Sequence, residues 1–319
     1  LSRDILNSGE LASLLGKGVT GLTSNPSIFK KAIADTDHYD SSIKELAKKN
    51  LSLDDLCEEL FVADVGVAAD LLKPIYESTK GIDGYASIEV SPLLAYDTEK
   101  TVEAGKRIWK KLNRHNIMIK VPATKEGLPA IRALLSDGIN VNVTLIFSVD
   151  RYKEVIKEFK EGLTNRAGSL TNIASVASFF VSRVDSIVEK KLANNKSALD
   201  KYLGKVGIAN SILAYDLFKN EFGSTFDVLR TKGAQLQRPL WASTGTKNPA
   251  FSPVLYVENL ALNNSVNTVP PATLEAILKG VKASTPPSVS DSQDIMNSLE
   301  KDGVVLEQIF KELEDDGVK

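Results

Sequence analysis

Residues 117–124, IMIKVPAT, place one lysine, Lys120, inside an otherwise apolar run. Its β-branched residues and the closing Pro122 are typical of a buried strand. Comparable short apolar runs occur at residues 18–22, 85–90, 140–147, 173–181, 239–243 and 265–269. Longer amphipathic segments separate them. Apolar strands that alternate with helices predict parallel βαβ units whose sheet is covered on both faces.

This alternation predicts an α/β protein, a single-domain (β/α)8 barrel over residues 1–319 with additional C-terminal helices. A doubly wound sheet is the alternative fold, but no G-x-G-x-x-G sequence follows the first apolar run. A barrel requires eight strands and the pattern supplies seven. We therefore expect the first strand to precede Leu1, which is not an initiator methionine.

Helices are expected in the segments between the strands and at the C-terminal end. Residues 290–293, SDSQ, resemble a capping box, and a last helix carries one apolar face that we expect to pack on the barrel. That face consists of Leu306, Ile309, Phe310 and Leu313. The other expected helices span residues 51–79, 98–113, 128–135, 149–165, 184–193 and 198–222.

Composition and charge exclude several classes of function. Lysine plus arginine number 39 and aspartate plus glutamate 41, a net charge of −2 that does not suggest a nucleic-acid or membrane partner. The one cysteine, Cys57, excludes an intrachain disulfide and is expected in the core. His38 and His115 have no ligand-spaced partner, so no metal site is expected. No apolar run approaches a membrane span, and we expect a cytoplasmic protein, or an organellar stroma if a transit peptide was removed.

Polar side chains recur along the strands, and in a barrel the carboxyl ends of all strands meet at the face that carries active sites. Lys120 is the most specific candidate among these polar residues. Burial of a lysine favours the neutral amine, which is the form that attacks a carbonyl. The alternative is a lysine that reaches solvent or pairs structurally with Glu89.

Each of the other polar candidates also has both a functional and a structural interpretation. Glu89 either faces the barrel, where it can move protons, or serves as an ion-pair partner. Asn142 and Thr144 share one side of their strand and either contact a substrate or form a satisfied polar layer. Arg183 and Lys247 follow strand ends, where a barrel binds phosphate, although most such cations lie on the surface.

Four motifs in order along the chain make the pattern specific. They are residues 18–29, GVTGLTSNPSIF; residues 119–124, IKVPAT; residues 141–148, VNVTLIFS; and residues 177–183, ASFFVSR. Together they resemble the transaldolase family, and the resemblance covers nearly the whole chain. It is closest to the longer branch of the family, which carries the WAST segment at residues 241–244.

The resemblance implies a role for each matched residue. Lys120 would form a Schiff base with a ketose phosphate, while Glu89 and Thr144 would hold a water that relays protons. Asn25, Asn142 and Ser178 would bind the dihydroxyacetone unit. Arg183, Ser243 and Lys247 would bind the phosphate, although shorter bacterial relatives have arginine at the position of Lys247.

The implied reaction moves a dihydroxyacetone unit from sedoheptulose 7-phosphate to glyceraldehyde 3-phosphate, in the pentose phosphate pathway. The products are erythrose 4-phosphate and fructose 6-phosphate. No metal or cofactor is expected, because the protonated imine is itself the electron sink. The expected partners are the sugar phosphates. The sequence leaves undecided whether the protein is a monomer or a homodimer.

Two other functions are weighed against this one. A fructose 6-phosphate aldolase would release free dihydroxyacetone, but such enzymes are shorter and carry Gln in place of Glu89 and Tyr in place of Phe180. A catalytically inactive barrel that serves as a binding protein is the second alternative. The family's catalytic Asp would lie two residues before Leu1, and Asp4 is its substitute only if the expected register is wrong. In the expected register, Asp4 begins the first helix.

Overall fold

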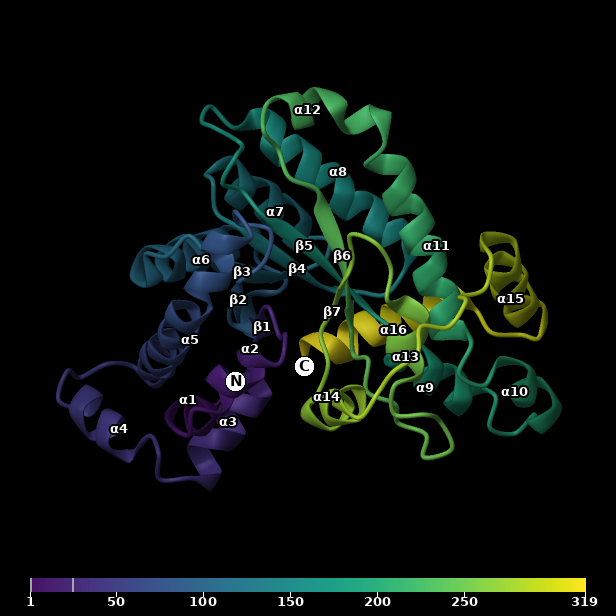
Figure 1. Ribbon diagram of the computed structural model, residues 1–319, viewed down its shortest axis with the longest axis horizontal. Coiled ribbons are helices and arrows are strands. Elements are labelled where there is room, and N and C mark those ends of the chain that lie inside the picture. Colours follow the sequence, from purple (N-terminus) through teal and green to yellow (C-terminus); the bar gives the residue numbers. More distant parts are fainter. Residues whose placement is uncertain (1, 25) are drawn as a thin grey trace.

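Seven parallel strands form the centre of the computed structural model, which describes residues 2–24 and 26–319 (Figure 1). Each strand pairs with the next in chain order, from β1 to β7. Sequential parallel order confirms the predicted α/β barrel architecture over the described residues, and it excludes a doubly wound sheet, in which the strand order reverses. The strands are β1 (Leu22–Thr23), β2 (Ala86–Glu89), β3 (Ile117–Pro122), β4 (Val141–Ile146), β5 (Ser175–Phe180), β6 (Gln237–Ala242) and β7 (Val266–Asn267).

Helices surround this sheet (Figure 1). The α-helices of the first half are α1 (Arg3–Asn7), α2 (Glu10–Gly16), α3 (Pro26–Asp35), α4 (Asp40–Ala47), α5 (Leu53–Ser78), α6 (Thr98–Leu112), α7 (Gly127–Ser136) and α8 (Val149–Asn165). Those of the second half are α9 (Ser182–Lys191), α10 (Lys196–Tyr202), α11 (Val206–Glu221), α12 (Asp227–Thr231), α13 (Leu255–Leu260), α14 (Pro271–Leu278), α15 (Val289–Lys301) and α16 (Leu306–Val318). Two short 3-10 helices are η1 (Pro92–Leu94) and η2 (Ser224–Phe226).

The two faces of the strands bury different sets of side chains. Alternate residues such as Ile88, Ile119 and Val143 are fully buried in the large cluster between the sheet and its helices. The opposite set fills the inside of the curved sheet, where a small apolar cluster contains Tyr85 and Met118. Because side chains alternate along a strand, residues an even number of positions from these two also face the inside. Glu89 and Lys120 therefore point into the barrel.

The C-terminal helix packs on the carboxyl end of the barrel, as expected. α16 contacts β4 and α9, and Ile309 and Leu313 are buried in a cluster that also contains Leu145. In Figure 1 this helix (yellow) lies close to the strands, inside the ring of outer helices. No helix in the described part of the chain is both long and apolar enough to cross a membrane.

Several predicted boundaries are wrong. The first strand is Leu22–Thr23 rather than residues 18–22, because Gly18 has a positive φ of 99° and belongs to the turn after α2. The helix expected over residues 198–222 is interrupted between α10 and α11, where Gly204 has a φ of 68°. The capping box lies at Ser288 and Asp291 rather than at residues 290–293. Cys57 is only partly buried rather than in the core.

Candidate active site

The centre of the site is an ion pair between two neighbouring strands. Glu89 of β2 pairs in register with Lys120 of β3, so their side chains lie at the same level inside the barrel. The Lys120 Nζ donates to Glu89 Oε2 at 2.8 Å and to the Ser24 carbonyl at 3.3 Å. Lys120 is only 8% exposed. An amine held in this way is shielded from bulk water but keeps a carboxylate within proton-transfer distance.

A hydrogen-bonded chain of uncharged groups adjoins this ion pair. Asn142 of β4 pairs in register with Lys120, and its side chain is fully buried. The Ser178 hydroxyl donates to Asn142 Oδ1 at 2.7 Å, while Asn142 Nδ2 donates to Ser87 Oγ at 3.1 Å. These two contacts fix the orientation of the amide. The site therefore offers a preset arrangement of donors and acceptors that suits a polyhydroxylated ligand.

Ser24 and Ser87 were missed by the sequence analysis. The Ser24 hydroxyl donates to the Ser87 carbonyl at 2.7 Å, which joins the end of β1 to β2. Ser87 had a detectable signal, because it lies two residues before Glu89 and so faces the same side of the strand. Ser24 contributes through its backbone carbonyl, a group that side-chain patterns do not reveal.

Thr144 lies almost fully buried at the end of β4, two residues beyond Asn142 on the same face. Leu145, which follows it, has a left-handed φ of 58°, and the register between β4 and β5 shifts between Val143 and Ile146. Left-handed backbone costs a residue with a Cβ about 1–2 kcal/mol. Such conformations cluster at functional sites, where the surrounding structure maintains them. Leu145 is retained by its packing in the cluster that contains α16.

A second left-handed residue, Ser243, directly follows β6 and has a φ of 55°. The Ser182 backbone N–H donates to the Ser243 carbonyl at 3.0 Å, and the two hydroxyls lie 2.8 Å apart. These contacts bring the end of β6 against the first turn of α9, which carries Arg183. Ser243 and Arg183 thus lie on adjoining segments at the carboxyl end of the barrel.

The Arg183 guanidinium is half-buried and lies 5.2 Å from the centre of the Phe180 ring. Burial lowers the pKa of Arg183, and the negative charges of Asp316 and Glu89 oppose that change. Lys247, by contrast, is exposed in the loop that follows β6.

Two other expectations concern the N-terminal segment. Asp4 is exposed in the first turn of α1, where its Oδ1 lies 3.5 Å from His38 Nε2. The structure therefore contradicts Asp4 as the substitute for the family's catalytic Asp, since its carboxylate pairs at the surface rather than with Lys120. Asn25 lies outside the described residues, as does Leu1.

Comparisons with known proteins identify the family of the chain. The family model described as transaldolase/fructose-6-phosphate aldolase matches residues 1–319. The chain belongs to this family. A transaldolase from Saccharopolyspora erythraea is 45% identical over 328 residues, which cover 100% of this chain and 88% of the relative. Transaldolases from Mycobacterium tuberculosis and Trichodesmium erythraeum are each 44% identical, and the matches cover 88% and 83% of their lengths.

Membership of the transaldolase/fructose-6-phosphate aldolase family covers two related activities. The residues that the structure gathers around Lys120 are those expected of a member that uses lysine chemistry. Lys120 donates to Glu89 and Ser178 donates to Asn142, and the register of β3 with β4 puts Asn142 next to Lys120. Arg183 and Ser243 lie on adjoining segments, and among the described residues no hydrogen bond or ion pair joins Lys247 to either group.

Proposed function

We propose that the protein is a transaldolase that transfers a dihydroxyacetone unit between sugar phosphates through a Schiff base on Lys120. The observation that carries the proposal is the 2.8 Å contact between Lys120 Nζ and Glu89 Oε2 inside the barrel. The contact supplies a nucleophile together with the group that can take its proton. The identities with curated transaldolases, 44–45% over the full chain, support the same reaction.

In the first half-reaction, Glu89 accepts a proton from the Lys120 ammonium, and the free amine attacks C2 of a ketose phosphate. Glu89 then returns this proton to the carbinolamine hydroxyl, which leaves as water and gives a protonated imine. The electron pair of the C3–C4 bond then moves into the imine, while the C4 hydroxyl loses its proton to Glu89 through a water held by Thr144. An aldose phosphate leaves, and a three-carbon enamine stays on Lys120.

The second half-reaction reverses these steps with a new acceptor. The enamine carbon attacks the carbonyl carbon of an incoming aldehyde, and the alkoxide that forms takes a proton back along the same path. Water then hydrolyses the imine to release the new ketose and free Lys120. Asn142 and Ser178 bind the hydroxyls of the three-carbon unit throughout, so the enamine is retained between the two halves.

The phosphate of each substrate is assigned to Arg183, with Ser243 beside it. A guanidinium matches the geometry of phosphate oxygens and binds them with charge-assisted hydrogen bonds. The Lys247 side chain extends the site only if its loop moves toward Arg183. Sedoheptulose 7-phosphate and fructose 6-phosphate are the donors, and glyceraldehyde 3-phosphate and erythrose 4-phosphate are the acceptors.

Product analysis separates this function from its nearest alternative. Fructose 6-phosphate is supplied with and without erythrose 4-phosphate, and free dihydroxyacetone and sedoheptulose 7-phosphate are measured. A transaldolase forms sedoheptulose 7-phosphate and releases little dihydroxyacetone when no acceptor is present. Rapid release of dihydroxyacetone without an acceptor would instead assign the chain to the aldolase activity of the family. No turnover in either condition would identify an inactive barrel.

A further inference from the structure

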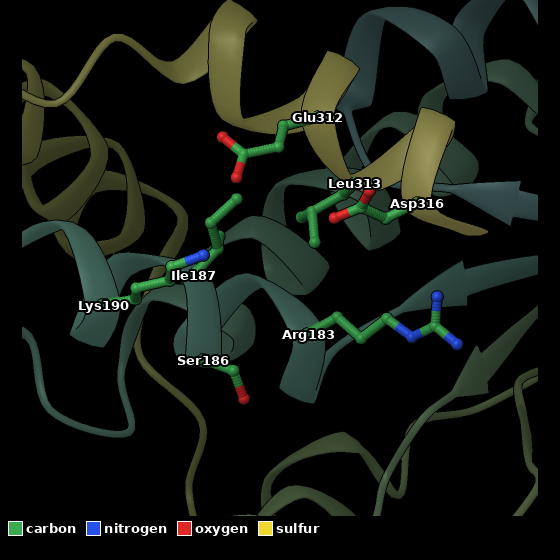
Figure 2. Close-up of a pocket in the computed structure, with 7 residues that line it drawn as sticks. All are labelled: Arg183, Ser186, Ile187, Lys190, Glu312, Leu313 and Asp316. Atoms are coloured by element: carbon green, nitrogen blue, oxygen red, sulfur yellow. The ribbon is translucent and has the colours of Figure 1, made fainter. Parts of the chain in front are cut away.

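A pocket of about 310 Å³ lies between α9 and α16 at the carboxyl end of the barrel. Figure 2 shows Arg183 extending from the first turn of α9, with Leu313 and Asp316 of α16 on the opposite wall. Lys190 and Glu312 lie toward the other end of the pocket. The residue assigned to phosphate binding thus forms one wall of a cavity whose other wall carries a carboxylate.

The charged groups in this pocket are not equally paired. Lys191 Nζ binds Glu312 Oε2 at 2.7 Å, so that carboxylate already has a cation. Asp316 has Lys319 Nζ at 3.3 Å, but both side chains are at least 60% exposed. Arg183 forms neither an ion pair nor a hydrogen bond with any side chain in the described residues. The negative charges of Asp316 and Glu89 both oppose the effect of burial on its pKa.

Asp316 and its neighbour Asp315, both on α16, have different partners. Asp315 is compensated by Lys311 at 2.6 Å and by the hydroxyl of Tyr96 at 3.3 Å. Asp316 instead has the exposed Lys319 Nζ at 3.3 Å, and it lines the pocket together with Arg183.

We infer that Asp316 is a specificity-determining residue that holds a negative charge opposite Arg183 until a substrate phosphate replaces it. The inference rests on the proposed function, because it assigns the phosphate to Arg183. A phosphate entering the site must overcome the repulsion of Asp316, and a departing phosphate is assisted by it. The carboxylate therefore sets how tightly phosphorylated substrates and products are held.

The test replaces Asp316 by asparagine in the full chain. Asp316→Asn should lower the KM for fructose 6-phosphate and the inhibition constant of inorganic phosphate by about two- to fivefold, the range expected for one partly exposed charge. kcat should change less than twofold. The gain in affinity for phosphate should shrink as ionic strength rises, because salt screens charges that are partly exposed. Asp316→Glu, which keeps the charge, should behave as the parent protein does.

Asp315→Asn is the matched control, because it removes the same charge from the same helical turn. Its side chain, however, does not line the pocket. Its inhibition constant for inorganic phosphate should equal that of the parent protein. An unchanged or weaker affinity for phosphate in Asp316→Asn would overturn the inference, as would an equal gain in Asp315→Asn.

Failure of this inference is distinguishable from failure of the proposed function. Calorimetric titration with inorganic phosphate reports binding without any turnover. If the parent protein forms no trapped imine with fructose 6-phosphate, the proposed function is wrong, whatever phosphate does. If the imine forms and the affinity for phosphate is the same with and without Asp316, the proposed function stands and the role of Asp316 is wrong.

Discussion

Glu89 Oε2 accepts a hydrogen bond from Lys120 Nζ at 2.8 Å, and strand register alone puts the two residues side by side. Parallel pairing of β2 with β3 makes them direct neighbours on the inner face, so the contact does not depend on a flexible loop. Both side chains are about 10% exposed. A carboxylate placed in this way can serve as a proton acceptor as well as a counter-ion.

Glu89→Gln tests which of these two roles applies. Glutamine can still accept a hydrogen bond from Lys120, but it cannot take a proton. We expect kcat to fall about 10²- to 10⁴-fold, the usual contribution of a positioned acid or base. The circular dichroism spectrum should be retained. Steady-state kinetics with fructose 6-phosphate and erythrose 4-phosphate measure the effect, and near-normal kcat would reduce Glu89 to an ion-pair partner.

Ser178→Ala tests the preset orientation of Asn142. The variant removes the donor that lies 2.7 Å from Asn142 Oδ1, which leaves a buried oxygen unsatisfied at a cost of about 1–3 kcal/mol. We expect kcat/KM to fall by about tenfold or more. Ser175→Ala is the control, since its hydroxyl donates to the Val141 carbonyl at 2.7 Å, near the start of the same strand. If both variants lose stability and neither loses activity, Asn142 does not bind substrate.

Arg183→Gln tests the assignment of the phosphate. Loss of a charge-assisted hydrogen bond of about 2 kcal/mol corresponds to a rise in KM of roughly 30-fold. The rise should appear with fructose 6-phosphate and not with fructose, which has no phosphate. Arg107→Gln is the control, because Arg107 binds Glu58 on the outer helices. An equal rise in KM with both sugars would show that Arg183 stabilises the fold and does not bind the phosphate.

Asp185 predicts how stability depends on pH. It is almost fully buried and accepts hydrogen bonds from the Gly207 N–H at 2.9 Å and the Tyr256 hydroxyl at 2.8 Å. Burial is the main cause that raises its pKa from 3.8 to about 6. The folded protein therefore binds this proton more tightly than the unfolded chain does. The stabilising contribution is complete below about pH 4 and is lost as the pH rises to about 6.

The corresponding measurement compares Asp185→Asn with the parent protein by urea unfolding at several pH values. Asparagine keeps the shape of the side chain and does not titrate. From pH 4 to pH 7 the free energy of unfolding of the variant should rise relative to the parent by about 2–3 kcal/mol. A difference that stays constant over this range would show that Asp185 has an ordinary pKa.

Much of the barrel could be predicted because its strands are strongly apolar. The limits of α8 match the predicted residues 149–165, and β3 ends at Pro122, the residue expected to close that strand. The two-residue strand β1 was misplaced because its sequence is no more apolar than the turn before it. The break between α10 and α11 depends on the left-handed conformation of Gly204. The periodicity of apolar residues does not reveal that conformation.

The site could be predicted as a set of residues but not as an arrangement. Alternation along a strand indicates that Asn142 and Thr144 share a face, yet it does not say whether that face is the inside of the barrel. The direction of Glu89 is settled only by the packing of Ala86 and Ile88 against the helices. The approach of α16 to Arg183 depends on the path of the C-terminal chain, for which no local pattern exists.

The central claim is that Lys120 forms an imine with the substrate, and reductive trapping tests it most directly. The protein is incubated with fructose 6-phosphate and borohydride, digested, and examined by mass spectrometry. The account predicts a reduced three-carbon or six-carbon adduct on Lys120, inactivation in proportion to the adduct, and neither in Lys120→Arg. Lys125→Arg, at an exposed position five residues away, should be trapped like the parent protein. Turnover by Lys120→Arg, or an adduct on another lysine with Lys120 unmodified, would contradict the account.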